Sequence, residues 1–115
     1  MNHKIAVFIP STMNVHETAS TEIINRWVRS AKEQFAELFG GFTSHNAVGG
    51  WVSPEHGLVE ENVTVVESYT DEYGLNRLSE VKAFARRMAM ALMQEAVAVE
   101  VDHSLHLVSP LCVAA

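Results

Sequence analysis

The sequence predicts a single α+β domain in which two helices cover one side of an antiparallel sheet. The chain has 115 residues, the size of one domain. Apolar residues make up 48% and charged residues 19%, which is typical of a chain with one packed core and not of a disordered chain. Short β-like runs also alternate with segments of helical spacing, in the order β-α-β-β-α-β.

The first half of the chain contains a predicted strand, helix and strand. Residues 4–9 are apolar and partly β-branched, and the run stops at Pro10, which predicts a strand followed by a polar loop. A helix is expected from about Thr21 to Phe39, and Gly40 and Gly41 end it. Its apolar residues repeat every three or four positions: Ile24, Val28, Ala31, Phe35 and Leu38. Residues 42–52 form a second strand, in which Gly49 and Gly50 indicate a bulge or a close backbone approach.

The second half repeats this pattern and adds a short arm. A turn over residues 53–57 leads to a third strand over about 60–69, and a helix is expected over about 76–93. A fourth strand over 96–101 turns at Asp102-His103 into a short fifth strand over 104–108. Right-handed crossovers make this order a ferredoxin-like βαββαβ sandwich with a C-terminal hairpin arm. The strands over 4–9 and 60–69 should be central, with 42–52 at an edge.

Both faces of the predicted sheet carry apolar residues. Ile5, Val7 and Ile9 share one face of the first strand, while Ala6 and Phe8 share the other. Two helices cover only one face, so the second face would leave an apolar patch larger than soluble monomers usually expose. We expect a second copy of the chain to cover it, in a homodimer or a higher even oligomer. The alternative is that residues 106–115 fold back over it; residues 109–115 otherwise read as a disordered tail.

Charge and cysteine content restrict the partners and the compartment. The chain has 8 Lys and Arg against 14 Asp and Glu, a net charge of −6, which disfavours binding to nucleic acid. No apolar run approaches the roughly 20 residues of a membrane-spanning helix. The single cysteine, Cys112, cannot form a disulfide within the chain, so we expect a cytoplasmic protein.

Several short segments resemble a group of proteins from mobile genetic elements. They are Phe8–Thr12, Phe39–Thr43, Gly50–Val52, Leu58–Thr64 and Gln94–Val101. These segments are similar to those of small uncharacterised proteins encoded on phages, plasmids and integron gene cassettes. The resemblance implies a mobile-element context and a compact α+β fold. It assigns no activity, so it carries over no catalytic residue.

The sequence contains no metal or cofactor motif. The six histidines form no pair at helical metal-ligand spacing, and neither GxGxxG nor a P-loop sequence occurs. We therefore expect no metal and no cofactor.

Glu67 is the principal candidate for a catalytic residue. Alternation places it on the same face of its strand as Val63 and Val65. A buried carboxylate needs a partner, which we expect to be an arginine of either helix, a hydroxyl or a ligand, unless Glu67 reaches water or a salt bridge near the strand end. Glu100 poses the same question.

Two functional hypotheses follow from these residues. The first is a non-catalytic binding or interaction module of a mobile genetic element, which acts as a homo-oligomer on a small molecule or a protein. The alternative is a small cofactor-independent enzyme that uses Glu67 as general acid or base in a pocket between sheet and helices. The side chains expected to shape that pocket are Ser11, Thr12, His45, Trp51 and Tyr69.

Overall fold

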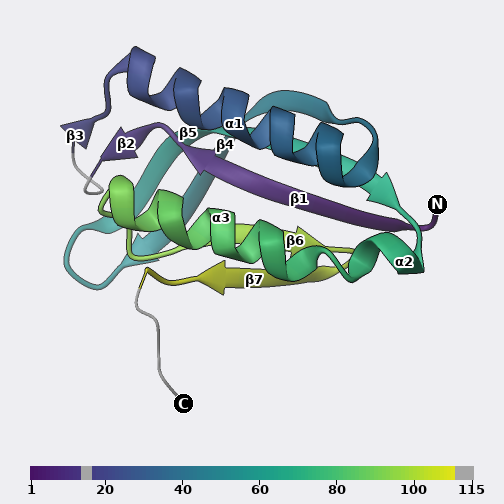
Figure 1. Cartoon of the computed structure of the whole chain (residues 1–115). Helices are drawn as coiled ribbons and strands as arrows, with labels where there is room; N and C mark the ends of the chain where they lie inside the picture. The colour runs from purple at the N-terminus through teal and green to yellow at the C-terminus, as the bar shows by residue number, and fades with distance from the viewer. Residues whose placement is uncertain (14–16, 111–115) are drawn as a thin grey trace.

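The structure is a computed structural model that describes residues 1–13 and 17–110 (Figure 1). Its strands are β1 (His3–Pro10), β2 (Thr12–Met13), β3 (Glu17–Thr18), β4 (Thr43–Ser53), β5 (Gly57–Thr70), β6 (Val97–Val101) and β7 (Ser104–Val108). Its helices are α1 (Thr21–Phe39), α2 (Glu72–Leu75) and α3 (Leu78–Ala91). Of the expected tail, residues 111–115 lie outside the described part of the chain.

The main sheet confirms the predicted fold. Its five strands lie in the order β4-β5-β1-β6-β7, and every described pairing between them is antiparallel. As predicted, β1 and β5 are inner strands and β4 is an edge strand. The predicted fifth strand, β7, extends the sheet beyond β6. Within the described residues, no helix has both the length and the apolar character needed to cross a membrane.

One apolar layer joins the helices to the sheet. Both long helices lie on the same side of the sheet, α1 over β5 and β1, and α3 over β6 and its neighbours (Figure 1). Phe35 of α1 and Met88 of α3 are fully buried against Ile5, Val7 and Val66. Burying such side chains contributes about 1.5–3 kcal/mol each, so this layer dominates the stability of the domain.

Helix α1 begins and ends where the sequence predicts. The Ser20 side chain accepts a hydrogen bond from the backbone N–H of Ile23, which caps the N-terminus. At the other end Gly40 adopts φ 86°, a left-handed conformation that glycine adopts without strain, and its N–H donates to the carbonyl of Ala36.

Three local predictions differ from the structure. The predicted loop after β1 contains the two-stranded β2–β3 hairpin. The predicted helix over 76–93 is preceded by the separate short helix α2, because the Asp71 side chain accepts from the N–H of Gly74 and starts a turn earlier in the chain. Gly49 and Gly50 form no bulge, since their pairing with Glu61 and Glu60 continues the register unbroken.

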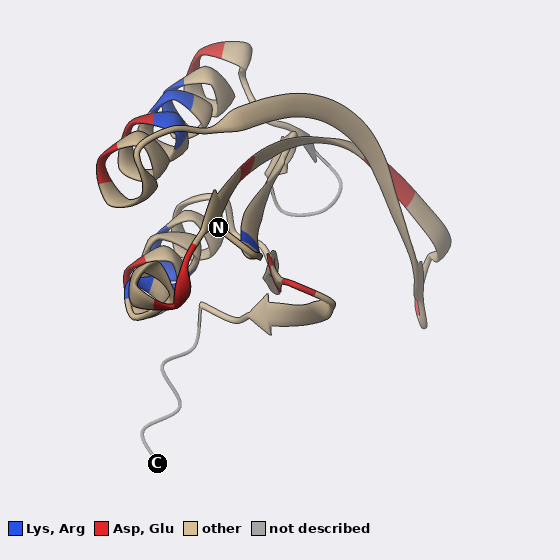
Figure 2. Cartoon of the chain, turned by 90° about the vertical axis from the view of Figure 1, so that its right-hand side faces the viewer, with Lys and Arg blue, Asp and Glu red and all other residues tan. Residues whose placement is uncertain are grey.

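The face of the sheet opposite the helices is uncovered by any described helix. We call it the open face. The long β4–β5 hairpin curves around this side of the sheet, away from the helical layer (Figure 2). Because side chains alternate along a strand, the residues between the core residues of β1 point to the open face. These are Lys4, Ala6 and Phe8.

Candidate functional site

Glu67 lies on the open face, on the inner strand β5. It is paired with Ala6 of β1 on one side and with Thr43 of β4 on the other. Ile5 and Val7, which flank Ala6, belong to the core under the helices. Directly paired residues share a face, so Glu67 and Ala6 point away from the helices. The prediction that Glu67 lines a pocket between sheet and helices is therefore wrong, because the strand register turns its carboxylate to the other side.

The partner of Glu67 is Lys4. The Nζ atom of Lys4 lies 2.9 Å from Glu67 Oε2 and 3.9 Å from Glu100 Oε1. The hydrogen bond to Glu67 is the main cause that raises the pKa of Lys4 above its usual value of 10.5. Glu67 therefore reaches a salt bridge, the alternative that the sequence left open, and its partner is a lysine of the next strand and not an arginine of a helix. Alternation with Ala6 and Phe8 was the sequence signal that places Lys4 on this face.

Glu67, Ala6 and Glu100 form a row across three adjacent strands. Ala6 is paired with both glutamates, so they flank it from β5 and β6. Strands lie about 4.8 Å apart, which separates the two glutamate Cα atoms by roughly 10 Å. Ala6 is fully buried beneath its neighbours and ends in a methyl group, with one carboxylate-bearing side chain on each side of it. We call Lys4, Ala6, Glu67 and Glu100 the acidic slot.

Apolar and aromatic side chains adjoin the acidic slot on the open face. Phe8 and Val65 are paired in the next row, where Val65 is buried and Phe8 partly so. Tyr69 is paired with Lys4 in the row on the other side and is 59% exposed. A ligand above Ala6 would therefore meet carboxylates on two sides and ring or alkyl surface along the strands.

Three of the other predicted site residues lie on the open face. His45, paired with Val65, and Tyr69 lie on the open face near Glu67. Trp51 shares that face but is paired with Val59, farther along the hairpin. The structure therefore brings His45 and Tyr69 to Glu67, and places Trp51 at a distance from it.

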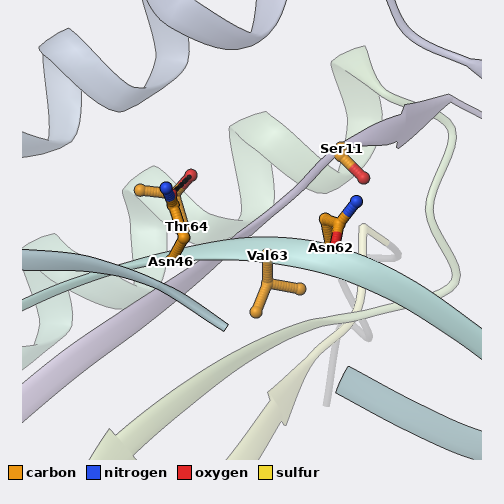
Figure 3. Close-up of a pocket in the computed structure, with 5 residues that line it drawn as sticks. All are labelled: Ser11, Asn46, Asn62, Val63 and Thr64. Atoms are coloured by element: carbon orange, nitrogen blue, oxygen red, sulfur yellow. Dashed lines mark hydrogen bonds between the residues drawn. The ribbon is translucent and has the colours of Figure 1, made fainter. Parts of the chain in front are cut away.

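Ser11 lies apart from Glu67, at the edge of a polar pocket. This pocket has a volume of about 330 Å³ and is lined by Ser11, Asn46, Asn62, Val63 and Thr64 (Figure 3). Asn46 and Thr64 share the helix side of the hairpin and are joined by a hydrogen bond of 3.4 Å. Ser11 and Glu67 therefore do not share this pocket.

Thr12 is held in a separate polar network beyond the end of β1. Its hydroxyl donates to Glu61 Oε2 at 2.6 Å, and the buried Gln94 donates through Nε2 to the Thr12 carbonyl at 2.8 Å. These bonds tie the start of β2 to β5 and to the segment after α3. Thr12 therefore has a structural role, in place of the predicted role in a pocket with Glu67.

Asp102 fixes the start of β1, and with it Lys4. Its side chain accepts from the backbone N–H of Lys4 at 2.9 Å and lies 2.8 Å from His3 Nδ1, while its own N–H donates to the Lys4 carbonyl at 2.8 Å. The His3 hydrogen bond, and next the Lys4 N–H, hold the pKa of Asp102 below its usual value of 3.8. The sequence placed Asp102 in a turn without indicating this contact, which joins residues almost a hundred positions apart.

Clusters suited to a metal ion are absent from the part of the chain that the structure describes. No group of three or more His, Cys, Asp or Glu side chains there is arranged to hold one. Cys112 lies outside the described residues.

Solved structures share this fold. A phage SAM lyase in complex with S-methyl-5'-thioadenosine matches with a TM-score of 0.65 and 14% identity, over 93% of this chain and 88% of that chain. A phage SAM lyase in the apo state matches with a TM-score of 0.60 and 16% identity, over the same shares of the two chains. No family model and no curated protein matches. At these identities the likeness extends to the fold: this chain is similar in architecture to the phage SAM lyases.

Proposed function

We propose that the chain binds S-adenosylmethionine on the open face, with the sulfonium at the acidic slot, and cleaves it to S-methyl-5'-thioadenosine. The observation that carries this proposal is the pair of carboxylates, Glu67 and Glu100, on either side of the small Ala6. The likeness of fold to lyases that take this nucleoside supports the choice of ligand.

The charges of the slot suit a cationic ligand. Two carboxylates and one ammonium leave a formal charge of −1 above Ala6. At about 4 Å, a unit charge pair gains about 1 kcal/mol in water and about 4 kcal/mol at the effective dielectric constant near a protein surface. Tyr69 and Phe8 add aromatic surface, which attracts cations through the ring quadrupole.

The proposed reaction is an intramolecular displacement. The carboxylate of the substrate attacks the γ-carbon of its own methionine chain, the bond from that carbon to sulfur breaks, and its electron pair passes to sulfur. The products are S-methyl-5'-thioadenosine and a five-membered lactone, with no proton transferred. The protein supplies the rate enhancement by holding the methionine chain of the substrate in a folded conformation. Glu67 then acts as a fixed charge, which replaces the general acid or base role expected from the sequence.

Product formation tests the proposal directly. The chain is incubated with S-adenosylmethionine, and S-methyl-5'-thioadenosine is quantified by chromatography against a buffer blank, since the substrate also decays on its own. We expect Glu67→Gln and Glu100→Gln to lower kcat/KM at least tenfold. Glu95→Gln, an exposed position outside the slot, is the matched control and should stay within twofold. A rate of product formation with the wild type that equals the rate in the buffer blank would refute the proposed enzymatic activity.

A non-catalytic module is the second candidate function, favoured by the exposed apolar residues of the open face. Leu105 and Leu107 of β7 lie there and are 61% and 69% exposed. We propose that a second copy covers them, in a homodimer or a higher even oligomer, and adds a wall to the ligand site. Binding of S-adenosylmethionine in calorimetry without cleavage would favour this module over the enzyme.

Light scattering tests the self-association. We expect an even multiple of the 12.7 kDa chain mass, reduced by Leu107→Glu and unaffected by Met90→Glu, which changes an exposed side chain on α3. A species of one chain at tens of micromolar would refute it.

We also propose that the chain is encoded on a mobile genetic element. The segments that resemble cassette and phage proteins support this, as does the phage source of the similar structures. Phage or recombination genes beside the coding sequence are the expected finding, and a conserved chromosomal operon would contradict it.

A further inference from the structure

We propose that the Lys4 ammonium occupies the cation position of the acidic slot in the free chain, and that a cationic ligand displaces it. Lys4 would then lower the preference for a sulfonium over a neutral thioether. This inference rests on the proposed ligand, and it concerns a residue that the sequence patterns do not single out.

The Lys4 ammonium lies between the two carboxylates of the acidic slot. Nζ lies 2.9 Å from Glu67 and 3.9 Å from Glu100, although the two glutamates come from strands on opposite sides of β1. Lys4 itself belongs to the neighbouring row, where it is paired with Tyr69. Its side chain therefore runs along the strand to reach the space above Ala6. That space is where a ligand's positive charge would be closest to both carboxylates.

Displacement of Lys4 is structurally simple. Its side chain is 33% exposed, so the ammonium can turn into water without crossing the core. Glu67 and Glu100 lie on strands that are each paired with β1, so their backbone positions are held when Lys4 moves. The cost to the ligand is the broken Lys4–Glu67 ion pair. A neutral ligand gains no attraction that would offset this cost, so Lys4 stays paired with Glu67 when such a ligand binds.

Lys4 therefore competes with cationic ligands and not with neutral ones. Without Lys4, the slot carries two carboxylates and no internal cation, so a positive centre binds with a higher affinity. A neutral thioether has no charge to place there, and its affinity should change little. The same difference would favour release of S-methyl-5'-thioadenosine after cleavage, because the reaction removes the positive charge.

Two ligands that resist cleavage measure this selectivity. Sinefungin carries a protonated amine in place of the sulfonium, and S-adenosylhomocysteine is the neutral thioether with the same amino acid chain. Calorimetry gives the ratio of their affinities for the wild type and for Lys4→Met. We expect Lys4→Met to raise the preference for sinefungin about tenfold, equivalent to ~1.4 kcal/mol. Lys82→Met, on α3 in the helical layer, is the control and should leave the ratio unchanged.

The possible results separate this inference from the proposed function. If the wild type binds neither ligand, the proposed function is refuted. If both ligands bind and Lys4→Met leaves the ratio unchanged or lowers it, only the role of Lys4 is refuted. Lys4→Gln, which keeps a hydrogen-bond donor for Glu67, provides a second variant with the same expected direction should Lys4→Met fail to fold.

Discussion

Replacing Glu67 by glutamine removes the charge that Lys4 binds while it keeps the size of the side chain. Lys4→Met removes the other charge, and the double variant closes a thermodynamic cycle. The cycle isolates the coupling between the two side chains from their separate effects on folding. It therefore measures how strongly the acidic slot is held together before any ligand is considered.

The structure sets the expected size of this coupling. At the 2.9 Å separation of Lys4 and Glu67, Coulomb's law gives about 1.4 kcal/mol in water and roughly four times more at an effective dielectric constant of ~20. Lost hydration and side-chain entropy offset most of it, and exposed pairs yield about 0.2–1 kcal/mol. Glu67 is 16% exposed, so we expect the upper end, about 1 kcal/mol. Glu100, at 3.9 Å and 34% exposed, should couple by less than about 0.5 kcal/mol.

Urea unfolding, followed by tryptophan fluorescence, provides the measurement. With a slope of about 2 kcal/mol per molar, 1 kcal/mol shifts the midpoint by about 0.5 M. The coupling should weaken in 1 M salt, because the pair is partly exposed. Glu95→Gln should leave the midpoint unchanged. A coupling below about 0.3 kcal/mol, or a greater loss from Glu100→Gln than from Glu67→Gln, would refute the geometry of the slot.

Three further predictions concern the scaffold. The pKa of Asp102 is depressed chiefly by His3, so the stabilising contribution of Asp102 is present above the unfolded pKa and is lost as the pH falls. The loss of Tm from Asp102→Asn should therefore be clear at pH 6 and shrink towards pH 3. A loss that does not depend on pH would contradict this. Phe35→Ala empties a fully buried site and should lower the free energy of unfolding in urea by about 3–5 kcal/mol. Tyr73 is 83% exposed, so Tyr73→Ala should lower it by under about 0.5 kcal/mol. Equal losses would argue against the burial of Phe35 in the core. A methyl group on Gly74 would collide with the Thr70 side chain, so Gly74→Ala should destabilise the fold by about 1–3 kcal/mol. Gly41→Ala adds a methyl group that meets no atom within 4 Å, so it should have a much smaller effect on the urea midpoint. The reverse order would be inconsistent with this packing.

Much of the fold could be predicted because its signals are local. Helix α1 follows from the spacing of its apolar residues, the Ser20 cap and Gly40, all within about twenty neighbouring positions. The β2–β3 hairpin and helix α2 were missed because each is short and has no apolar periodicity of its own. Such elements depend on particular hydrogen bonds, such as the one from Gly74 to Asp71.

The candidate site could be predicted only in part. Glu67 was identified because a carboxylate among valines needs an explanation, and Tyr69 because it shares that face. Lys4 and the central position of Ala6 were missed. Ser11 and Thr12 were grouped with Glu67 because they follow β1, but Ser11 lines a different pocket and Thr12 binds Glu61.

By itself the sequence determined which residues share a face of each strand and that both faces carry apolar side chains, because alternation is a property of neighbouring residues. Only the tertiary structure decided which face the helices cover and the register in which β5 and β6 pair with β1. Ala6, Glu67 and Glu100 are far apart in the chain, and the register of strand pairing brings them into one row. That register depends on long-range packing and turn geometry, so no local pattern could place Lys4 between the two glutamates.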